Sequence, residues 1–499
     1  MKKWLKTTLL LTLAGSMLLT ACGNNNAGDS GGVTNIKTQV INYAPEFIGP
    51  DNPLWQEFEK RTNTKLNITW LSPTTAEDKI NVMLASGDLP DLTYVETLDN
   101  SQLRKMIDQG VFWDLTELLK EYPNLNRKEF EVMWRDSKIN GKNYGVPRYY
   151  PAYGGGIFPM FRKDWLDKLQ LQAPANVDEF REVLKAFKTK DPNGNGQADE
   201  VPYAATPGSM GFLYNVFNET QGSWKLKDGK LAPIITEDAS RDALLYIKQL
   251  FDDGLLPPDF AIMKFSQVTD LIRSGKAGGV GYSMNQAWIH TEFIRKADPN
   301  ADLIPLASIE NKAGVKYTPS GVPYYGVFLI PKKVPEDKVK KILSFLDYGY
   351  GPEGNTLAFY GVKDVHYKEE NGNKVPTEQA KKDMVGDGNM ASIFHLVSDD
   401  MAISAIGMPD DFYKRNVDIV TERKKVDVPQ PDRGLFSEKF NRYFPDIQKK
   451  VDDMRTKVII GKETIEAYDK LIEQLRNDAQ LKEITDEMNE YYAKRQAEL

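Results

Sequence analysis

Near the start of the folded chain, stretches with the apolar pattern of strands alternate with stretches that have the apolar spacing of helices. Three short stretches rich in β-branched and aromatic residues predict strands. Between them, apolar residues spaced three and four apart predict helices. Strands that alternate with helices pair in parallel through right-handed crossovers, so this pattern predicts an α/β sheet. The predicted strands are 36–43, 66–71 and 92–95, and the predicted helices are 54–61 and 75–86.

The same mixed pattern continues along the rest of the chain. Further strands are predicted at 156–162 and 324–331, with several helices between them. The stretches 438–454 and 464–494 are strongly helical in their spacing. The hydropathy pattern therefore predicts an α/β fold that ends in a helix-rich C-terminus.

The first residues have the pattern of an export signal. Three lysines precede an apolar run at 7–19, which is shorter than the roughly 20 residues that span a bilayer. The run ends in Leu-Thr-Ala-Cys, which resembles the lipobox of bacterial lipoproteins and implies that Cys22 carries the lipid. An ordinary secretory signal is the alternative, but Cys22 is the only cysteine and has no disulfide partner. A small, polar stretch follows and predicts a flexible linker. We therefore expect a protein anchored in the cell membrane through lipid, on its extracytoplasmic face.

The amino-acid composition limits the kind of protein that the folded part can be. The chain has 499 residues, 41% of them hydrophobic and 27% charged, which is ordinary for a globular protein. Its formal net charge is −7, and an acidic chain argues against nucleic acid as a partner. The 23 Tyr, 22 Phe and 8 Trp exceed the needs of a core, and aromatic faces commonly hold sugar rings.

Four stretches carry a resemblance to a known family. They are 81–91 (NVMLASGDLPD), 157–166 (IFPMFRKDWL), the loop 191–200 and the tail 458–492. In this order, the chain resembles family 1 extracellular solute-binding proteins, in the oligosaccharide-receptor branch with LplA-like and alginate-binding proteins. The likeness covers essentially the whole mature chain.

The resemblance implies a two-lobed, periplasmic-binding-protein-like fold with interleaved lobes and a hinge that closes on a ligand. The implied division is 1–21 signal peptide, 22–33 lipidated cysteine and linker, 34–147 first part of the N-lobe, 148–298 first part of the C-lobe, 299–340 N-lobe return segment, and 341–499 mainly C-lobe with hinge-associated helices. It also implies a monomer that delivers an oligosaccharide to the permease of an ABC transporter.

The loop 191–200 (DPNGNGQADE) is a candidate calcium site. Ca²⁺ prefers six to eight oxygen ligands, and Asp191, Asn193 and Asn195 match the alternating positions of an EF-hand loop, with Gln197 offering its carbonyl. The twelfth position is Pro202 rather than glutamate. The resembled alginate receptors imply that Asp199 or Glu200 supplies the bidentate carboxylate instead. A metal-free turn is the alternative, since Asp, Asn and Gly all favour turns.

The candidate sugar site consists of polar and aromatic residues in loops. Ligands of α/β sheets bind beyond the carboxyl ends of strands, where 43–47 and 94–97 would lie. We expect the first crossing between lobes near 148–156 and another near 324. The candidate ligand contacts are Trp288, Tyr150, Tyr149, Tyr153, Arg148, Asn285, Gln286, Tyr325 and Glu96, with Tyr324 beside them.

Two other functional classes stay open at this point. The sequence has no G-x-S-x-G, H-E-x-x-H or G-x-x-x-x-G-K motif, and its three histidines follow no metal-ligand spacing. A glycoside hydrolase or lyase needs only two well-placed carboxylates, which leave no local signature. A receptor for peptides or other small solutes could share the same fold. We expect a binding protein and no enzyme.

Overall fold

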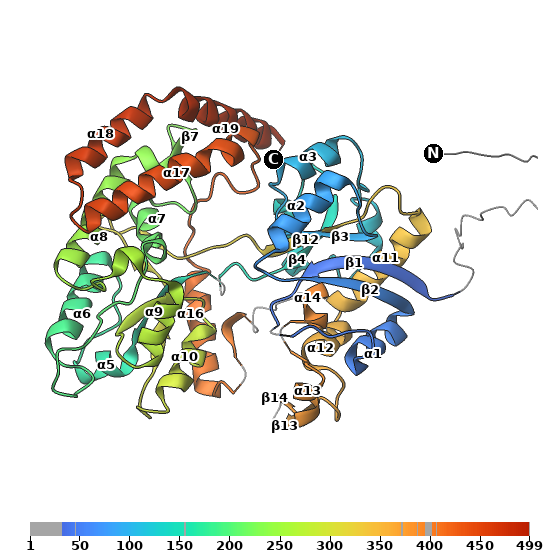
Figure 1. Cartoon of the computed structure of the whole chain (residues 1–499), viewed down its shortest axis with the longest axis horizontal. Helices are drawn as coiled ribbons and strands as arrows, with labels where there is room; N and C mark the ends of the chain where they lie inside the picture. The colour runs from blue at the N-terminus through green and yellow to red at the C-terminus, as the bar shows by residue number, and fades with distance from the viewer. Residues whose placement is uncertain are drawn as a thin grey trace, which may run out of the picture.

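The computed structural model describes residues 32–44, 46–153, 156–370, 373–386, 388–394, 402–405 and 407–498. The predicted signal peptide, Cys22 and nearly all of the predicted linker lie outside the described residues. The described chain forms two lobes that lie side by side and are joined by connecting segments (Figure 1). This two-lobed α/β architecture confirms the predicted fold class.

The N-lobe is built on a five-stranded sheet in the order β2-β1-β3-β12-β4. β1 pairs in parallel with β2 and with β3, as the alternating strand and helix pattern predicts, whereas β12 runs antiparallel to β3 and β4. The strands are β1 (Thr34–Ile41), β2 (Thr64–Leu71), β3 (Leu92–Val95), β4 (Gly145–Tyr149) and β12 (Tyr324–Leu329).

Local chemistry fixes where the first helices of this lobe start and stop. α1 (Pro53–Thr62) begins at Asn52, whose side-chain oxygen accepts the N–H of Leu54 at 2.9 Å, and proline at the first helical position fits because it lacks an N–H. α2 (Ala76–Ser86) ends at Gly87 with φ 73°, a left-handed conformation that glycine adopts without strain.

Helices from a distant part of the chain complete the N-lobe core. Residues from α11, α12 and α14 are buried in the same cluster as β1 and β3. The expectation that 341–394 belongs to the C-lobe is therefore wrong, because its apolar stripes pack on the first sheet. The other elements of this lobe are α3 (Ser101–Asp108), η1 (Leu118–Glu121), η2 (Lys128–Phe130), α4 (Glu131–Asp136), α11 (Glu336–Tyr350), α12 (Pro352–Tyr360), β13 (Tyr367–Glu370), β14 (Asn373–Pro376), α13 (Glu378–Lys382) and α14 (Met390–Phe394).

The C-lobe contains a small antiparallel sheet, β8-β5-β9, enclosed by helices. Residues 299–317 pack in this lobe through Leu306, Ile309 and Tyr317, so the predicted N-lobe return begins near 324 rather than at 299. The sheet strands are β5 (Phe158–Arg162), β8 (Gly279–Tyr282) and β9 (Leu303–Pro305), and the hairpin strands are β6 (Trp224–Lys227), β7 (Lys230–Pro233), β10 (Ile309–Glu310) and β11 (Lys316–Tyr317).

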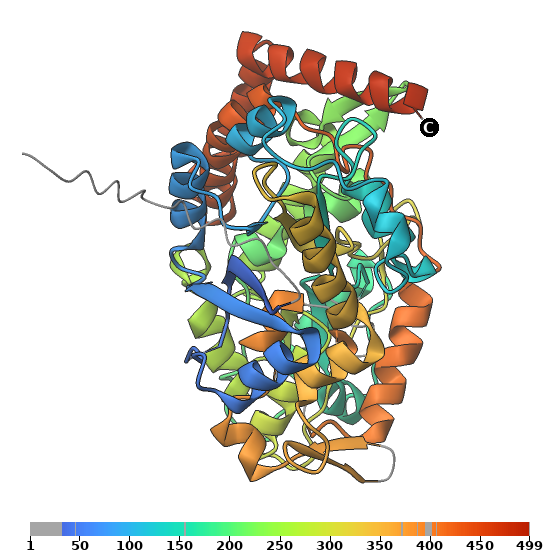
Figure 2. The same cartoon turned by 90° about the vertical axis from the view of Figure 1, so that its right-hand side faces the viewer.

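The last helices of the chain pack on the C-lobe and gather at one end of the molecule (Figure 2). Among the described residues, no helix is both long and apolar enough to cross a membrane. The C-lobe helices are α5 (Lys163–Lys168), α6 (Val177–Thr189), η3 (Gly208–Met210), α7 (Phe212–Asn218), η4 (Ile234–Thr236), α8 (Asp238–Asp252), η5 (Phe260–Ile262), α9 (Phe265–Arg273), α10 (Gln286–Ile294), α16 (Asp410–Arg423), α17 (Glu438–Ile459), α18 (Ile465–Arg476) and α19 (Ala479–Glu498).

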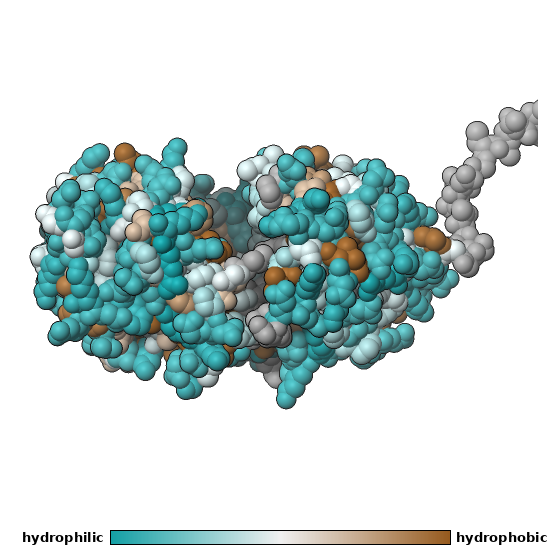
Figure 3. All heavy atoms as spheres, turned by 90° about the horizontal axis from the view of Figure 1, so that it is seen from below, coloured by the Kyte–Doolittle hydropathy of each residue, from teal (hydrophilic) through white to brown (hydrophobic). Residues whose placement is uncertain are grey.

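The chain passes between the lobes three times. It leaves the N-lobe after β4, returns before β12, and leaves again after α14 towards α16. The lobes are thus interleaved along the chain, and a hollow separates them in the space-filling view (Figure 3).

Candidate functional site

Strand direction decides which residues of the N-lobe face the crossings. β1, β3 and β4 end at the edge where antiparallel β12 begins. In the C-lobe, β8 and β9 end where β5 begins, since both run antiparallel to β5. The first crossing joins these two edges, so polar groups at them lie between the lobes, as expected for ligand sites at carboxyl ends of strands.

A cluster of two tyrosines and a glutamate forms at the N-lobe edge. The hydroxyls of Tyr43, after β1, and Tyr325, on β12, are in direct contact. The Tyr325 hydroxyl also donates to Glu96 Oε1 at 3.3 Å. Tyr43 is 52% exposed, so a large part of its surface is accessible to a ligand. Burial and the neighbouring Tyr43 raise the pKa of Tyr325, so its hydroxyl stays protonated near neutral pH.

Arg148 is not available to a ligand, so its predicted role as a sugar contact is wrong. Its side chain is fully buried, and all three nitrogen groups are used. Nε donates to the Tyr325 carbonyl at 2.9 Å, Nη1 to the Ser392 carbonyl at 2.6 Å, and Nη2 to the Tyr94 hydroxyl at 2.9 Å. Arg148 therefore holds the second and third crossings to the sheet.

The other predicted tyrosines of the first crossing are half-buried. The Tyr149 ring packs on Phe130, with centroids 4.9 Å apart. The Tyr150 N–H donates to the Pro323 carbonyl at 3.1 Å, which ties the first crossing to the second. Tyr153 packs against a small apolar cluster of the C-lobe. Each ring keeps some exposed surface, and contact with a ligand stays a prediction.

On the C-lobe side, Asn285 and Gln286 lie at the start of α10 and are half-buried. Asn285 accepts a hydrogen bond from the Ser283 hydroxyl at 2.9 Å. Trp288 is only 6% exposed, because its indole packs edge-on against Phe412 of α16, with centroids 4.9 Å apart. This exposure is too small for stacking on a sugar ring in the conformation described, so here Trp288 is a packing residue.

The loop 191–200 folds around its own side chains. Asp191 Oδ1 accepts the N–H of Gly194 at 2.9 Å, and Oδ2 accepts that of Gly196 at 3.0 Å. The side-chain oxygens of Asn193 and Asn195 accept N–H groups two residues further on, at 2.9 and 2.7 Å. These turns bring the predicted oxygen ligands onto one small loop.

Carboxylates of this loop lie close enough to one another for their negative charges to interact. Burial and the nearby Asp191 and Asp199 raise the pKa of Glu200, and its buried Oε1 has no hydrogen-bond partner. Asp199 is held by the Asn195 amide at 2.9 Å and by Lys276 at 3.3 Å. The described residues contain no cluster of three or more His, Cys, Asp or Glu side chains drawn together as for a metal ion. A cation would offset the repulsion among these carboxylates, and oxygen ligands of this kind are those that Ca²⁺ prefers.

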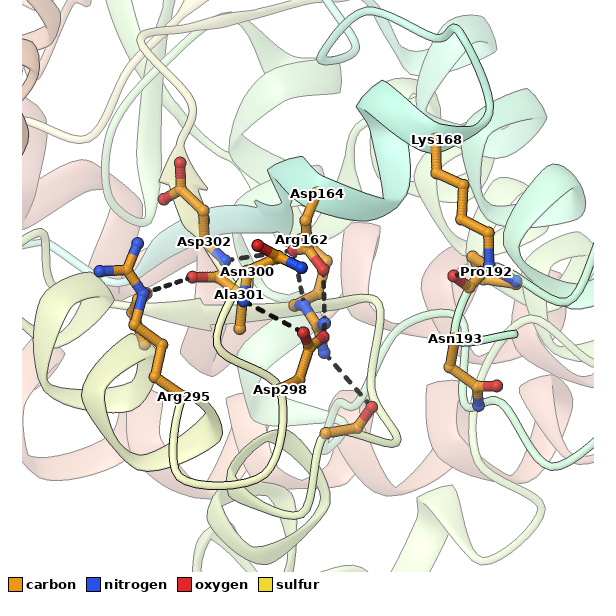
Figure 4. A network of polar contacts seen from close by, with 12 residues as sticks. Arg162, Asp164, Lys168, Pro192, Asn193, Arg295, Asp298, Asn300, Ala301 and Asp302 are labelled. Atoms are coloured by element: carbon orange, nitrogen blue, oxygen red, sulfur yellow. Dashed lines mark hydrogen bonds and ion pairs between the residues drawn. The ribbon is translucent and has the colours of Figure 1, made fainter. Parts of the chain in front are cut away.

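A polar network braces the region beside this loop (Figure 4). Lys168 Nζ, on α5, donates to the Pro192 carbonyl at 2.9 Å. At the start of α5, the buried Arg162 pairs with Asp164 at 2.5 Å and with Asp298 at 2.7 Å. The loop is thus attached to the element that follows β5, away from the crossings.

The histidines that the structure describes are structural. His290 is buried, which lowers its pKa to about 4, and Arg273 donates to its Nδ1 at 3.3 Å. His366 is buried in the other lobe, where its Nε2 lies 3.0 Å from Asp383 Oδ2. They lie in different lobes and do not combine into one site.

A model of the bacterial extracellular solute-binding protein family matches residues 38–356, well over half of the chain. The chain belongs to this family. Lipoprotein LipO of Bacillus subtilis (strain 168) is 29% identical over 485 residues, covering 95% of this chain and 94% of LipO. The polygalacturonan/rhamnogalacturonan-binding protein YtcQ of the same organism is 28% identical over 490 residues, covering 95% of each chain.

Solved structures confirm the fold. The alginate-binding protein AlgQ2, solved without calcium ion, superimposes with a TM-score of 0.66 at 21% identity, over 93% of this chain and 99% of AlgQ2. A solute-binding protein for HMO from Bifidobacterium longum infantis gives a TM-score of 0.69 at 20% identity, over 92% and 99%. The resemblance seen in the sequence is therefore confirmed at the level of family and architecture.

Sequence reasoning did not single out every residue that builds the region between the lobes. Tyr43 lies in the stretch 43–47, which was expected to face a ligand, but it was not among the predicted contacts. No sequence pattern pointed to Arg423. Arg423 is 1% exposed and donates to the carbonyls of Tyr153 and Leu306 at 2.8 Å. Only the packing of α16 beside the first crossing explains its position.

Proposed function

We propose that this protein is a membrane-anchored receptor that captures an oligosaccharide between its lobes and delivers it to the permease of an ABC transporter. The observation that carries the proposal is the cluster of Tyr43, Tyr325 and Glu96 at the edge between the lobes. It combines an exposed aromatic ring with hydroxyl and carboxylate groups, the chemistry that recognises sugar rings.

Two relatives support different parts of this proposal. YtcQ is a polygalacturonan/rhamnogalacturonan-binding protein, which supports a sugar ligand, and LipO is a lipoprotein, which supports a lipid anchor. The lipobox-like Cys22 supports anchoring through lipid, since two or more acyl chains hold a protein stably on a membrane. No catalytic role is needed for this function.

The mechanism we infer is closure about the three crossings. The open form samples closed arrangements, and a sugar that contacts both lobes stabilises the closed one. Arg148 and Arg423 anchor the crossings at each end, so the bending is confined to the short segments between them.

A thermal-shift screen of residues 23–499 against neutral and acidic oligosaccharides tests the proposal. Ligand at a hundred times its Kd stabilises a protein by about 2.7 kcal/mol, so a binding sugar raises the Tm by a few degrees. Every hit is analysed for cleavage by chromatography. A shift with intact sugar supports the receptor, whereas a degraded hit favours an enzyme. No shift with any sugar, in folded protein, rejects a sugar ligand and favours peptides or another solute.

We also propose that the loop 191–200 binds Ca²⁺ as a structural brace. Asp191, Asn193, Asn195, Asp199 and Glu200 would supply side-chain oxygens, and Gln197 its backbone carbonyl. The buried, unpartnered carboxylate oxygen of Glu200 supports this role. The ion would rigidify the C-lobe without taking part in sugar recognition.

A further inference from the structure

A cavity of about 330 Å³ lies at the junction of the two lobes, and we call it the hinge cavity. Asp136 on α4 of the N-lobe bounds it on one side, and Arg495 on α19 of the C-lobe bounds it on the other. Tyr153 and Ser320, from the first and second crossings, lie between them. A molecule in this cavity would contact both lobes.

Positive side chains outnumber negative ones among the residues that line the hinge cavity, although the chain as a whole is acidic. Three arginines line it, against the two carboxylates of Asp136 and Asp427. The formal net charge of the chain is −7. A local excess of positive charge in an acidic protein favours an anionic ligand. The three arginines are Arg135, Arg433 and Arg495.

The Asp136 side chain has no exposed surface, so it acts as a counter-ion behind the arginines rather than as a group open to the cavity. Its oxygens lie 2.9 Å from Arg135 Nε, 3.6 Å from Arg433 Nη1 and 4.0 Å from Arg495 Nη2. This buried charge keeps three guanidinium groups close together, which their mutual repulsion would otherwise oppose.

Two of the arginines differ in how firmly they are held. Arg433 donates to the Ser320 carbonyl and hydroxyl, each at 3.2 Å, and to Gln430 at 2.9 Å. Arg495 is 25% exposed at its side chain, and it makes no hydrogen bond to any residue that the structure describes. Its N–H groups are therefore the ones available to a ligand.

The remaining lining suits a sugar unit. Tyr153 and Tyr492 are half-buried and line the cavity with aromatic surface. A volume of 330 Å³ equals that of about eleven water molecules, which leaves room for one sugar ring and not for a chain. Guanidinium groups bind carboxylates through paired N–H donors.

We propose that the hinge cavity binds one carboxylate-bearing sugar unit, such as a uronic acid, with its carboxylate at Arg495. The site is separate from the cluster of Tyr43, Tyr325 and Glu96, because none of these three residues lines the hinge cavity. The sugar class rests on the proposed function, and the acidic group rests on the cavity itself.

The test compares galacturonic acid, its methyl ester and galactose by calorimetry on residues 23–499. Every described core residue lies between 36 and 488, so this chain keeps both hydrophobic cores. We expect galacturonic acid to bind at least tenfold more tightly than the methyl ester, which has the same ring but no charge. We also expect its affinity to fall when salt is raised from 50 to 500 mM.

Arg495→Gln is the matched variant, and Arg442→Gln on exposed α17 surface is its control. We expect Arg495→Gln to lose about tenfold in affinity for galacturonic acid and Arg442→Gln to lose none. Equal binding of acid and ester, or no binding of either, overturns the hinge-cavity proposal. If the same preparation still binds neutral oligosaccharides, only the hinge-cavity proposal fails. If it binds no sugar at all, the proposed receptor function fails as well.

Discussion

In the N-lobe, Arg148 at the end of β4 has no exposed surface, and in the C-lobe Arg423 at the end of α16 is 1% exposed. Neither forms an ion pair with any residue in the described part of the chain. Both donate to backbone carbonyls near the crossings instead. The first two crossings share backbone hydrogen bonds at Tyr150 and Gly321, and the carbonyls that these bonds do not reach need donors from side chains.

The two arginines differ in what surrounds them. Arg148 also bonds the Tyr94 hydroxyl and lies over its ring, with the guanidinium carbon 4.5 Å from the centroid. Arg423 lies 5.4 Å from the Phe158 ring, and within the described part of the chain it donates to the carbonyls of Leu306 and Tyr153. Carbonyl dipoles and aromatic faces thus balance a buried cation in both lobes, more completely in the N-lobe.

The largest expected effect comes from removing either arginine. Arg148→Met and Arg423→Met should each lower the free energy of unfolding by about 3–5 kcal/mol, because buried carbonyls lose their donors. Urea unfolding followed by fluorescence measures this. The exposed Arg442→Met should change stability by less than about 0.5 kcal/mol. A buried variant as stable as this control would show that the crossings do not need these donors.

Calcium should increase the stability of the C-lobe and leave that of the N-lobe unchanged, because the loop 191–200 lies in the C-lobe. Ca²⁺ at a hundred times its Kd should add about 2.7 kcal/mol, and EDTA should remove it. The gain should increase with pH through the acidic range above 4.5, because Glu200 has a raised pKa and must lose its proton to bind the ion.

The matched variants for calcium are Asp191→Asn in the loop and Asp228→Asn in the exposed β6–β7 turn of the same lobe. Differential scanning calorimetry with and without Ca²⁺ should show the gain in the second variant and not in the first. Equal gains in both would place the ion elsewhere.

Asp432 lies beside the hinge cavity and should make stability depend on pH. Burial raises its pKa to about 6, above the ordinary value of 3.8, so the folded state prefers the protonated form. Its contribution to stability is present below pH 3.8 and is lost as pH rises through 6. Asp432→Asn should remove that slope and stabilise the protein at pH 7 by about 1–2 kcal/mol. Thermal unfolding from pH 4 to 8 checks this, and a variant that keeps the wild-type slope would contradict it.

The smallest effect on stability is expected at the cluster between the lobes. Tyr43 is exposed, so Tyr43→Ala should change the free energy of unfolding by less than about 0.5 kcal/mol. Loss of its ring should weaken oligosaccharide binding about fivefold, or about 1 kcal/mol. Calorimetric titration with a sugar from the thermal-shift screen measures this. Tyr491→Ala on α19 is the control, and equal affinities of the two variants would exclude Tyr43 from the binding site.

Local patterns in the sequence predicted the elements well where packing and periodicity agree. The strands predicted at 36–43, 66–71 and 92–95 appear as β1, β2 and β3, and the two helices between them also form. The Asn-Gly pair at 140 and 141 has φ of 50° and 74°, as a tight hairpin turn requires. Each of these features depends on neighbours in the chain.

The sequence by itself determined the family and the α/β class, and it predicts the export signal, because these follow from local periodicity and short motifs. The tertiary structure alone decided that 341–394 returns to the N-lobe and that Arg148 and Trp288 are buried. An apolar stripe predicts that a helix packs against something, but not which sheet it packs on. Likewise, the sequence does not show whether a polar loop side chain donates to buried carbonyls or to solvent. Those outcomes depend on contacts between residues far apart in the chain, such as Arg148 and Ser392.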